Sequence, residues 1–232
     1  MKILCWVALM FCAMPCFAQN IFEVLAQKNY EQLVTLKANV NDKDKNNMTP
    51  LLRATYANDL KAVKILVENG ADISAVSNAK WTPLMVACQT ADIEIAEYLL
   101  EKGADVNTKD EHNWTPIIIS SRNGKTKIVK MLLTKGVDVN AVAEDKSTPL
   151  ILAAYKNHID VVKQLLEYKA DPNKVNRDSE TALQLAAKQG NIEVVKLLLQ
   201  YKADKTFVNK DGLSICDIAS RSGHQEICAL LQ

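Results

Sequence analysis

The chain has 232 residues, of which 48% are hydrophobic and 24% are charged, and its formal net charge is +1. This composition excludes a disordered or collagen-like chain and provides enough apolar material for a sizeable core. Nucleic-acid-binding proteins normally carry a surplus of basic residues, so the near-neutral charge argues against a nucleic-acid partner.

The N-terminal segment differs from the rest of the chain. Lys2 is followed by an uncharged segment over residues 3–14, and the small residue Ala18 stands directly before Gln19. A positive start, an apolar run and small residues in this order are typical of a secretory signal peptide. We therefore predict a signal peptide over residues 1–18, with cleavage between Ala18 and Gln19.

A membrane anchor and a lipoprotein are the two alternatives for this segment. The apolar run is too short for an anchor, because a membrane span needs about 20 apolar residues. The residues before Cys12 and Cys16 resemble a bacterial lipobox poorly, since Phe11 and Pro15 stand where a small residue is expected. We therefore expect export without membrane insertion after cleavage, to the periplasm in a Gram-negative source and to the outside otherwise.

Removal of the signal peptide also defines the charge and the thiols of the mature chain. It takes away one lysine and no acidic residue, which leaves 27 basic and 27 acidic residues. Three cysteines remain, Cys88, Cys216 and Cys228, so at least one thiol stays unpaired within the chain. Export makes a disulfide chemically accessible. The absence of Cys-x-x-Cys from the mature sequence argues against a zinc or thioredoxin-like site.

An internal repeat of 33 residues occupies the rest of the chain. We number each repeat from its first Thr or Ser, as position 0, which is Thr49, Thr82, Thr115, Thr148, Thr181 or Ser214. A proline follows the first four of these residues, a small residue recurs at position 5, and leucine recurs at position 17. A fixed period of this length indicates stacked structural repeats.

Each repeat predicts a pair of helices. The residue at position 0 is a helix N-cap, and proline suits the first helical position. The turn at position 9 holds residues that tolerate a left-handed backbone, namely Asn58, Gly124, Asn157, Gly190 and Gly223. A second helix follows, as in residues 159–168, and ends near a glycine such as Gly70, Gly103 or Gly136. One such pair cannot bury its own apolar stripe, but stacked pairs can.

This pattern resembles the ankyrin repeat, most closely in "TPLILAA" at residues 148–154 and "GADVN" at residues 103–107. The resemblance covers nearly all of residues 20–232. It implies an all-α solenoid of stacked helix-turn-helix units with protruding β-turn fingers. The expected units are an N-terminal capping half-repeat over residues 19–46, repeats over residues 47–76, 80–109, 113–142, 146–175 and 179–208, and a C-terminal capping repeat over residues 212–232.

Two departures from the family pattern have structural consequences. The histidine that usually follows Thr-Pro-Leu is absent, because position 3 is Leu52, Met85, Ile118, Ile151, Gln184 or Asp217. Lys169 and Lys202 replace the glycine after the second helix. A left-handed conformation costs a non-glycine residue about 1–2 kcal/mol. We therefore expect the fourth and fifth repeats either to be looser or to end their helices differently.

The resemblance implies a binding surface on the concave face and its rim. According to the resemblance, the residue before position 0 lies on the finger at the rim, and the residue at position 7, at the end of the first helix, lines the concave face. These positions gather Trp, Tyr and Arg, the residue types that dominate interface hot spots. The predicted partner-binding residues are Met48, Tyr56, Trp81, Trp114, Arg122 and Tyr155. In the alternative interpretation, the tryptophan rings pack along their own fingers and serve only as structural cover.

The sequence gives no support for catalysis, a metal or a cofactor. The histidines His112, His158 and His224 form no pair at the spacing of a zinc site, and no phosphate-binding loop or nucleophile elbow is present. His158 and His224 share one repeat position, which favours a structural role. The cysteines fall at core positions, and Cys216 and Cys228 are candidates for a disulfide because both face the same core.

The expected function is therefore that of an exported module that binds a partner protein. It would act as an inhibitor or immunity protein, or as an accessory factor of an exported enzyme. The alternative is an effector delivered to a host or competitor cell. A thiol-based redox protein or enzyme is a further alternative, and it would require a reactive cysteine. The polar C-terminal cap should stop end-to-end stacking, so we expect a monomer.

Overall fold

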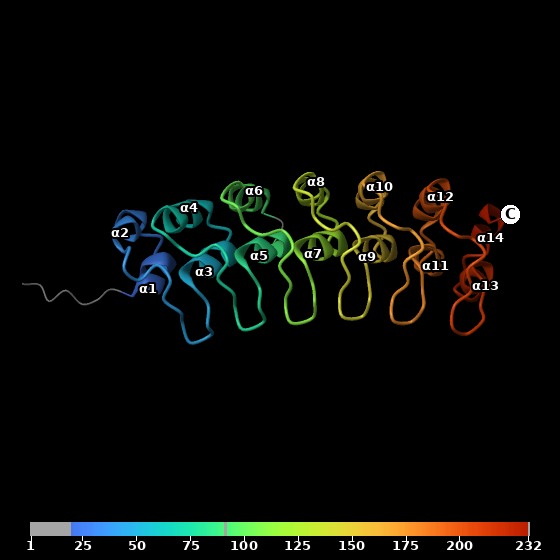
Figure 1. The fold of residues 1–232 in the computed structure, drawn as a ribbon, viewed down its shortest axis with the longest axis horizontal. Coiled ribbons are helices and arrows are strands. Elements are labelled where there is room, and N and C mark those ends of the chain that lie inside the picture. The colour runs from blue at the N-terminus through green and yellow to red at the C-terminus, as the bar shows by residue number, and fades with distance from the viewer. Residues whose placement is uncertain (1–19, 91, 232) are drawn as a thin grey trace, which may run out of the picture.

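The computed structural model describes residues 20–90 and 92–231 (Figure 1). The predicted signal peptide and its cleavage site at Ala18–Gln19 lie outside the described residues. Within the described part, fourteen helices form seven consecutive pairs, and there is no strand. The fold is therefore an all-α repeat solenoid.

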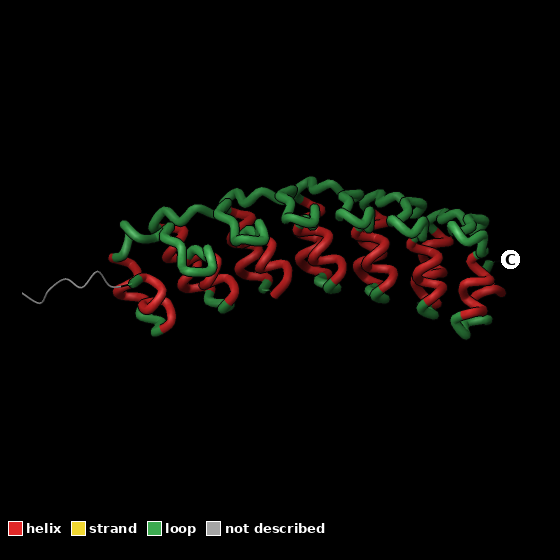
Figure 2. Tube along the Cα trace, turned by 90° about the horizontal axis from the view of Figure 1, so that it is seen from below, coloured by secondary structure: helices red, strands yellow, loops and turns green. Residues whose placement is uncertain are grey.

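The pairs follow one another along the chain. Their helices are α1 (Ile21–Ala26) and α2 (Tyr30–Thr35), α3 (Pro50–Tyr56) and α4 (Leu60–Glu68), α5 (Pro83–Thr90) and α6 (Ile93–Glu101), α7 (Pro116–Arg122) and α8 (Thr126–Thr134), α9 (Pro149–Tyr155) and α10 (Ile159–Glu167), α11 (Ala182–Lys188) and α12 (Ile192–Gln200), and α13 (Ile215–Arg221) and α14 (Glu226–Leu230). The odd-numbered helices form an inner row next to the fingers, and the even-numbered helices form an outer row (Figure 1). The row of pairs follows a shallow arc, with the loops along one edge (Figure 2).

The N-terminal cap differs from the half-repeat that the sequence suggests. It contains both helices of a pair, α1 and α2, each six residues long. The corresponding helices of the first repeat have seven and nine residues. The cap is thus a shortened complete pair, and its second helix packs against α4.

The inner helices begin as the Thr-Pro pattern predicts, with one exception. The hydroxyl of Thr49 accepts a hydrogen bond from the Leu52 backbone N–H at 3.3 Å, and Thr181 and Ser214 form full capping boxes. Thr115 makes no such bond, although its hydroxyl oxygen is buried. The start of α7 therefore relies on its proline and on packing.

The outer helices of the fourth and fifth repeats end at the same repeat position as those of the other repeats. Lys169 and Lys202 adopt left-handed backbone conformations, with φ angles of 66° and 62°. Helices α10 and α12 end at Glu167 and Gln200, at position 19, where α4, α6 and α8 also end. The expectation that these repeats end their helices differently is therefore wrong. The two lysines instead bear the free-energy cost of the left-handed conformation.

The core runs without interruption between the two rows of helices. The leucines at position 17 from the first to the fifth repeat are fully buried, namely Leu66, Leu99, Leu132, Leu165 and Leu198. The small residues at position 5, such as Ala87 and Ser120, are also fully buried, since each inner helix packs against two others. A larger side chain at position 5 would have no space in this close-packed interior.

Hydrogen bonds between successive loops join most of the repeats. The aspartate at position 23 accepts a bond from the backbone N–H two residues later, and this turn directs the side chain at position 25 toward the next repeat. There an asparagine oxygen accepts from the N–H of the next aspartate, in the pairs Asn41–Asp72, Asn107–Asp138, Asn140–Asp171 and Asn173–Asp204. We call this series the asparagine ladder.

The ladder lacks one rung between the first and second repeats. Ser74 stands at position 25, and it bonds to Asp72 of its own turn instead. Among the described residues, no hydrogen bond crosses from the first repeat to the second. Apolar packing of α3 on α5 and of α4 on α6 joins them, together with the Lys64 ammonium, 5.7 Å from the centre of the Tyr98 ring.

Candidate functional site

The fingers are short turns directly before each position 0. In every finger a backbone hydrogen bond runs from the N–H at position −5 to the carbonyl at position −1, as from Asp44 to Met48 at 3.0 Å. The residue at position −2 has a positive φ angle in all six fingers. An aspartate or asparagine at position −5 tightens four of them, because its side chain accepts backbone bonds from positions −3 and −1. The fingers are thus ordered before any partner binds.

Three contacts show that the fingers and the inner helices share one surface. The Arg122 guanidinium lies 5.1 Å from the centre of the Trp114 ring. Lys188 forms an ion pair with Glu180 at 3.3 Å, and the Nε of Arg53 donates to Asp44 at 2.7 Å. Each contact joins an inner helix to its own finger. We call this surface, made of positions 4 and 7 of the inner helices and positions −5 and −1 of the fingers, the concave face.

The residues at position 7 form its exposed row. All six are exposed, namely Tyr56, Gln89, Arg122, Tyr155, Lys188 and Arg221. Tyr56 and Tyr155 expose 45% and 38% of their surface, which is unusual for large aromatic side chains. Burial of the remainder raises the pKa of Tyr56, so its hydroxyl stays protonated and able to donate a hydrogen bond.

Trp81 connects two fingers. Its side chain is partly buried against the core, and its indole Nε1 donates a hydrogen bond to Oδ2 of Asp110 at 3.0 Å. The other carboxylate oxygen of Asp110 accepts from the backbone N–H groups of His112 and Trp114. Asp110 is only 8% exposed, so these bonds compensate a largely buried charge. The second finger is thereby bonded to the third.

Trp114 and Met48 also lie partly buried. The Trp114 ring packs against the core and under Arg122, and no hydrogen bond of its indole nitrogen is found among the described residues. These contacts, and those of Trp81, give both tryptophans a packing role. The Trp114 ring lies beside the exposed Arg122, so any recognition role of Trp114 would come in addition to packing.

A groove lies at the N-terminal end of the concave face, between α1 and α3. Its volume is about 550 Å³, and Phe22, Leu25, Arg53 and Tyr56 are among the residues that line it. The sequence interpretation selected only Tyr56 from this set. Phe22 and Leu25 were missed because the cap helices do not follow the repeat period.

The finger tips from the third to the sixth repeat are linked in a chain. His112 bonds to Glu144 at 3.1 Å, and this bond raises the pKa of the His112 imidazole. The Arg177 backbone N–H donates to the carbonyl of Asp145 at 2.7 Å. In the last pair, Lys210 bonds to Asp178 at 2.7 Å.

The other chemically reactive side chains have structural surroundings. The ring of His158 covers Gly124 and lies 3.0 Å from the Arg122 carbonyl oxygen. Cys88 is fully buried, and burial strongly raises the pKa of its thiol, so it offers no reactive thiolate. The described residues contain no cluster of metal-ligating side chains, and none of their helices has the length and apolarity of a membrane span.

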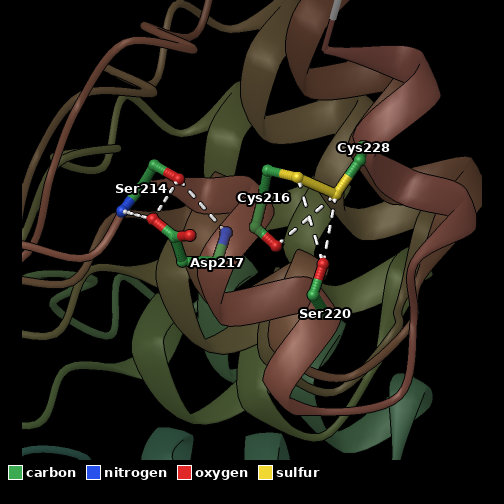
Figure 3. The surroundings of a disulfide bond; sticks show 5 residues. All are labelled: Ser214, Cys216, Asp217, Ser220 and Cys228. Carbon is green, nitrogen blue, oxygen red and sulfur yellow. Dashed lines mark hydrogen bonds between the residues drawn. A yellow bond between two sulfur atoms is a disulfide. The ribbon is translucent and has the colours of Figure 1, made fainter.

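A disulfide joins Cys216 in α13 to Cys228 in α14 (Figure 3). Their Cα atoms are 4.9 Å apart, and the Ser220 hydroxyl lies 3.4 Å from the Cys228 sulfur. The pair lies beside the capping box of Ser214 and Asp217 at the start of α13 (Figure 3). The bond therefore attaches the last helix of the chain to the helix before it.

Comparison with known families gives a clear result. A family model described as ankyrin repeats, in three copies, matches residues 9–110, 108–176 and 168–232. The matches together cover nearly the whole chain. No curated protein matches the chain.

Proposed function

Because the chain belongs to the ankyrin-repeat family, we propose that its protein–protein interaction activity resides on the concave face. Ankyrin repeats in general are interaction scaffolds rather than enzymes. The observation that carries the proposal is the exposed row at position 7, with Tyr56, Arg122 and Tyr155 next to the ordered fingers. Tyr and Arg side chains exposed in this way are typical binding anchors.

The mechanism is recognition by a surface that is ordered in advance. Backbone bonds close each finger, and the Trp81–Asp110 bond and the tip contacts hold neighbouring fingers together. Little conformational entropy is then lost when a partner binds, because the fingers do not need to become ordered. Affinity would come mainly from the aromatic and arginine side chains of the row.

Site-specific photo-crosslinking tests this proposal. A photoreactive phenylalanine analogue would replace Tyr155 on the concave face or, as the control, Tyr168 at the end of α10. Tyr168 is exposed to a similar extent, 41% against 38%. In extracts of cells that produce the protein, we expect protein adducts at position 155 and none at position 168. Adducts at position 168 alone would contradict the proposal.

We also propose that the protein acts after export, as an inhibitor or immunity protein or as an accessory factor of an exported enzyme. The support is the charge and apolar pattern of residues 1–18. The test is the intact mass of the protein recovered from the periplasm or the medium. A mature chain that begins at Gln19 is the expected result, and a chain that keeps Lys2 and stays in the cytoplasm would overturn the proposal.

A further inference from the structure

The helix side of the concave face carries charge of one sign. The inner helices from α3 to α11 contain Arg53, Arg122 and Lys188 and no acidic residue. The outer helices from α4 to α12 together contain both signs, although α6 has only acidic charges and α8 only basic ones. A chain with a net charge of only +1 therefore presents a locally basic surface beneath its fingers.

The acidic groups that reach this face from the fingers already have partners. Asp44 bonds to Arg53, Asp110 to Trp81 and Glu180 to Lys188. Each pair removes one acidic group from contact with a ligand. Two of the pairs also neutralise a basic residue of the helix side, so the charge that remains comes from other side chains.

Two cations in or beside the middle of the face have no acidic partner among the described residues, namely Arg122 on the concave face and Lys156, which directly follows Tyr155 of that face in the turn after α9. The Arg122 guanidinium lies over the Trp114 ring, and the Lys156 ammonium lies 5.1 Å from the centre of the Tyr155 ring. Arg122 and Lys156 are both exposed. They belong to α7 and to the turn after α9, in adjacent repeats whose inner helices are in contact. Each pair combines an uncompensated positive charge with an apolar ring.

We propose that this part of the concave face binds an acidic linear segment of a partner protein. Carboxylates of the segment bind Arg122 and Lys156, and its apolar side chains pack on the exposed parts of Trp114 and Tyr155. An arginine binds a carboxylate through two parallel hydrogen bonds, which fixes the orientation of the segment. The inference rests on the function proposed above and adds the chemistry of the partner.

A nucleic acid would meet the same two cations but fits the surroundings less well. The neighbouring finger tips interleave acidic residues, Glu144, Asp145 and Asp178, with basic ones, so they offer a continuous phosphate backbone no uninterrupted run of positive charge. A short acidic segment needs only the width of two repeats and avoids those tips. The charge of the face thus favours a carboxylate ligand of limited length.

The first test uses a displayed library of random twelve-residue peptides on the purified protein, expressed from the full chain. We expect the selected peptides to be enriched in Asp and Glu. One selected peptide, labelled with fluorescein, is then titrated by fluorescence anisotropy. Arg122→Glu is expected to weaken its binding at least about tenfold, as reversal of one member of a charge pair does.

The matched control is Lys130→Glu. Lys130 is exposed on the outer helix α8, so this substitution changes the net charge equally but leaves the concave face intact. Its binding should stay within about twofold of the original, since a distant exposed charge is largely screened by salt. Circular dichroism of both variants verifies that they are folded.

Several outcomes would overturn the inference. These are the selection of neutral or basic peptides, no selection at all, or an equal loss of affinity in both variants. Tighter binding of a fifteen-nucleotide oligo-dT than of the acidic peptide would reassign the face to nucleic acid. If protein crosslinks at position 155 persist while the acidic peptides fail, the interaction module stands and only its acidic partner is rejected.

Discussion

At the scale of single residues, the side chains that sequence patterns single out often serve two purposes. Trp81 was selected as a recognition residue, and the structure shows that its indole is bonded to Asp110 of the next finger. The two residues are 29 positions apart, so local periodicity could not reveal the contact. Only the stacking of one finger on the next brings them together.

Replacement of Trp81 by Phe should lower the free energy of unfolding by about 1.5–3 kcal/mol, the usual contribution of a hydrogen bond to a charged group. Phenylalanine keeps one aromatic ring at this position but has no indole N–H, so Asp110 loses one partner in a buried setting. Trp114→Phe is the control, because no hydrogen bond of its indole is found in the described part. Urea unfolding followed by circular dichroism would measure both. Equal losses would show that the Asp110 bond contributes little.

A substitution at Gly190 would test the close contact between the fifth and sixth repeats. Its φ angle is +74°, and an added Cβ would lie 2.5 Å from the nearest atom of the His224 ring. Gly190→Ala should cost about 2–4 kcal/mol, from left-handed strain and overpacking together. Gly136→Ala carries similar strain at φ +77° but has open space around it, so about 1–2 kcal/mol is expected there. Thermal unfolding of the two variants distinguishes the two contributions.

At the scale of elements, helix α14 depends on its attachment to α13. It has only five residues, too few for a helix that is stable alone in water. The disulfide between Cys216 and Cys228, with a sequence separation of 12, fixes it to the preceding helix. The C-terminal cap, which shields the core of the fifth repeat, is therefore held covalently.

A Cys216→Ser, Cys228→Ser variant should lose about 3 kcal/mol of local stability, the typical value for a loop of this size. Hydrogen exchange with mass spectrometry should show faster exchange in α13 and α14 and unchanged rates from α3 to α8. Treatment of the original protein with dithiothreitol should reproduce the pattern. Uniformly faster exchange along the chain would contradict a local role.

The fingers should respond to acid. Partial burial tends to raise the pKa of Asp44, but bonds from the Met48 backbone and from Arg53 outweigh it and hold this pKa below 3.8. The bond from Lys210 lowers the pKa of Asp178. A lowered pKa in the folded state means that the stabilisation is complete above pH 3.8 and is lost as the pH falls through the folded-state value.

We therefore expect the melting temperature to fall as the pH is lowered from 5 to 2.5. In Asp178→Asn the fall in melting temperature should be smaller, since one of the titrating groups is gone.

The contribution of His112 to stability changes with pH in the opposite direction. Its raised pKa gives stabilisation that is complete below pH 6.5 and is lost as the pH rises through the folded-state value. Circular dichroism melts between pH 2.5 and 8 measure both, and a flat profile would contradict them.

At the scale of the whole molecule, the 33-residue period predicted the architecture because each repeat contains its own helix caps, turns and apolar stripe. Thr49, for example, caps the helix that directly follows it, and Leu66 lies on the buried face of its own helix. Residues of the same type recur at these positions in each repeat. Contacts between repeats are less predictable. The lost cap at Thr115 and the chain of charged finger tips depend on how one copy meets the next. A pattern within one repeat does not contain that geometry.

The missing rung of the asparagine ladder gives the molecule one compliant point along its length. Every other junction between described repeats has at least one hydrogen bond beside its apolar packing, but the junction between the first and second repeats has only the contact of Lys64 with the Tyr98 ring. Under a stretching force applied to the two ends, this junction should extend first. The substitution Ser74→Asn would give the backbone N–H of Asp105 the missing side-chain acceptor. It should therefore raise the force at which the first extension step occurs in an optical-tweezers recording. In the original protein, the repeats before and after this junction should therefore extend as two separate segments of unequal length.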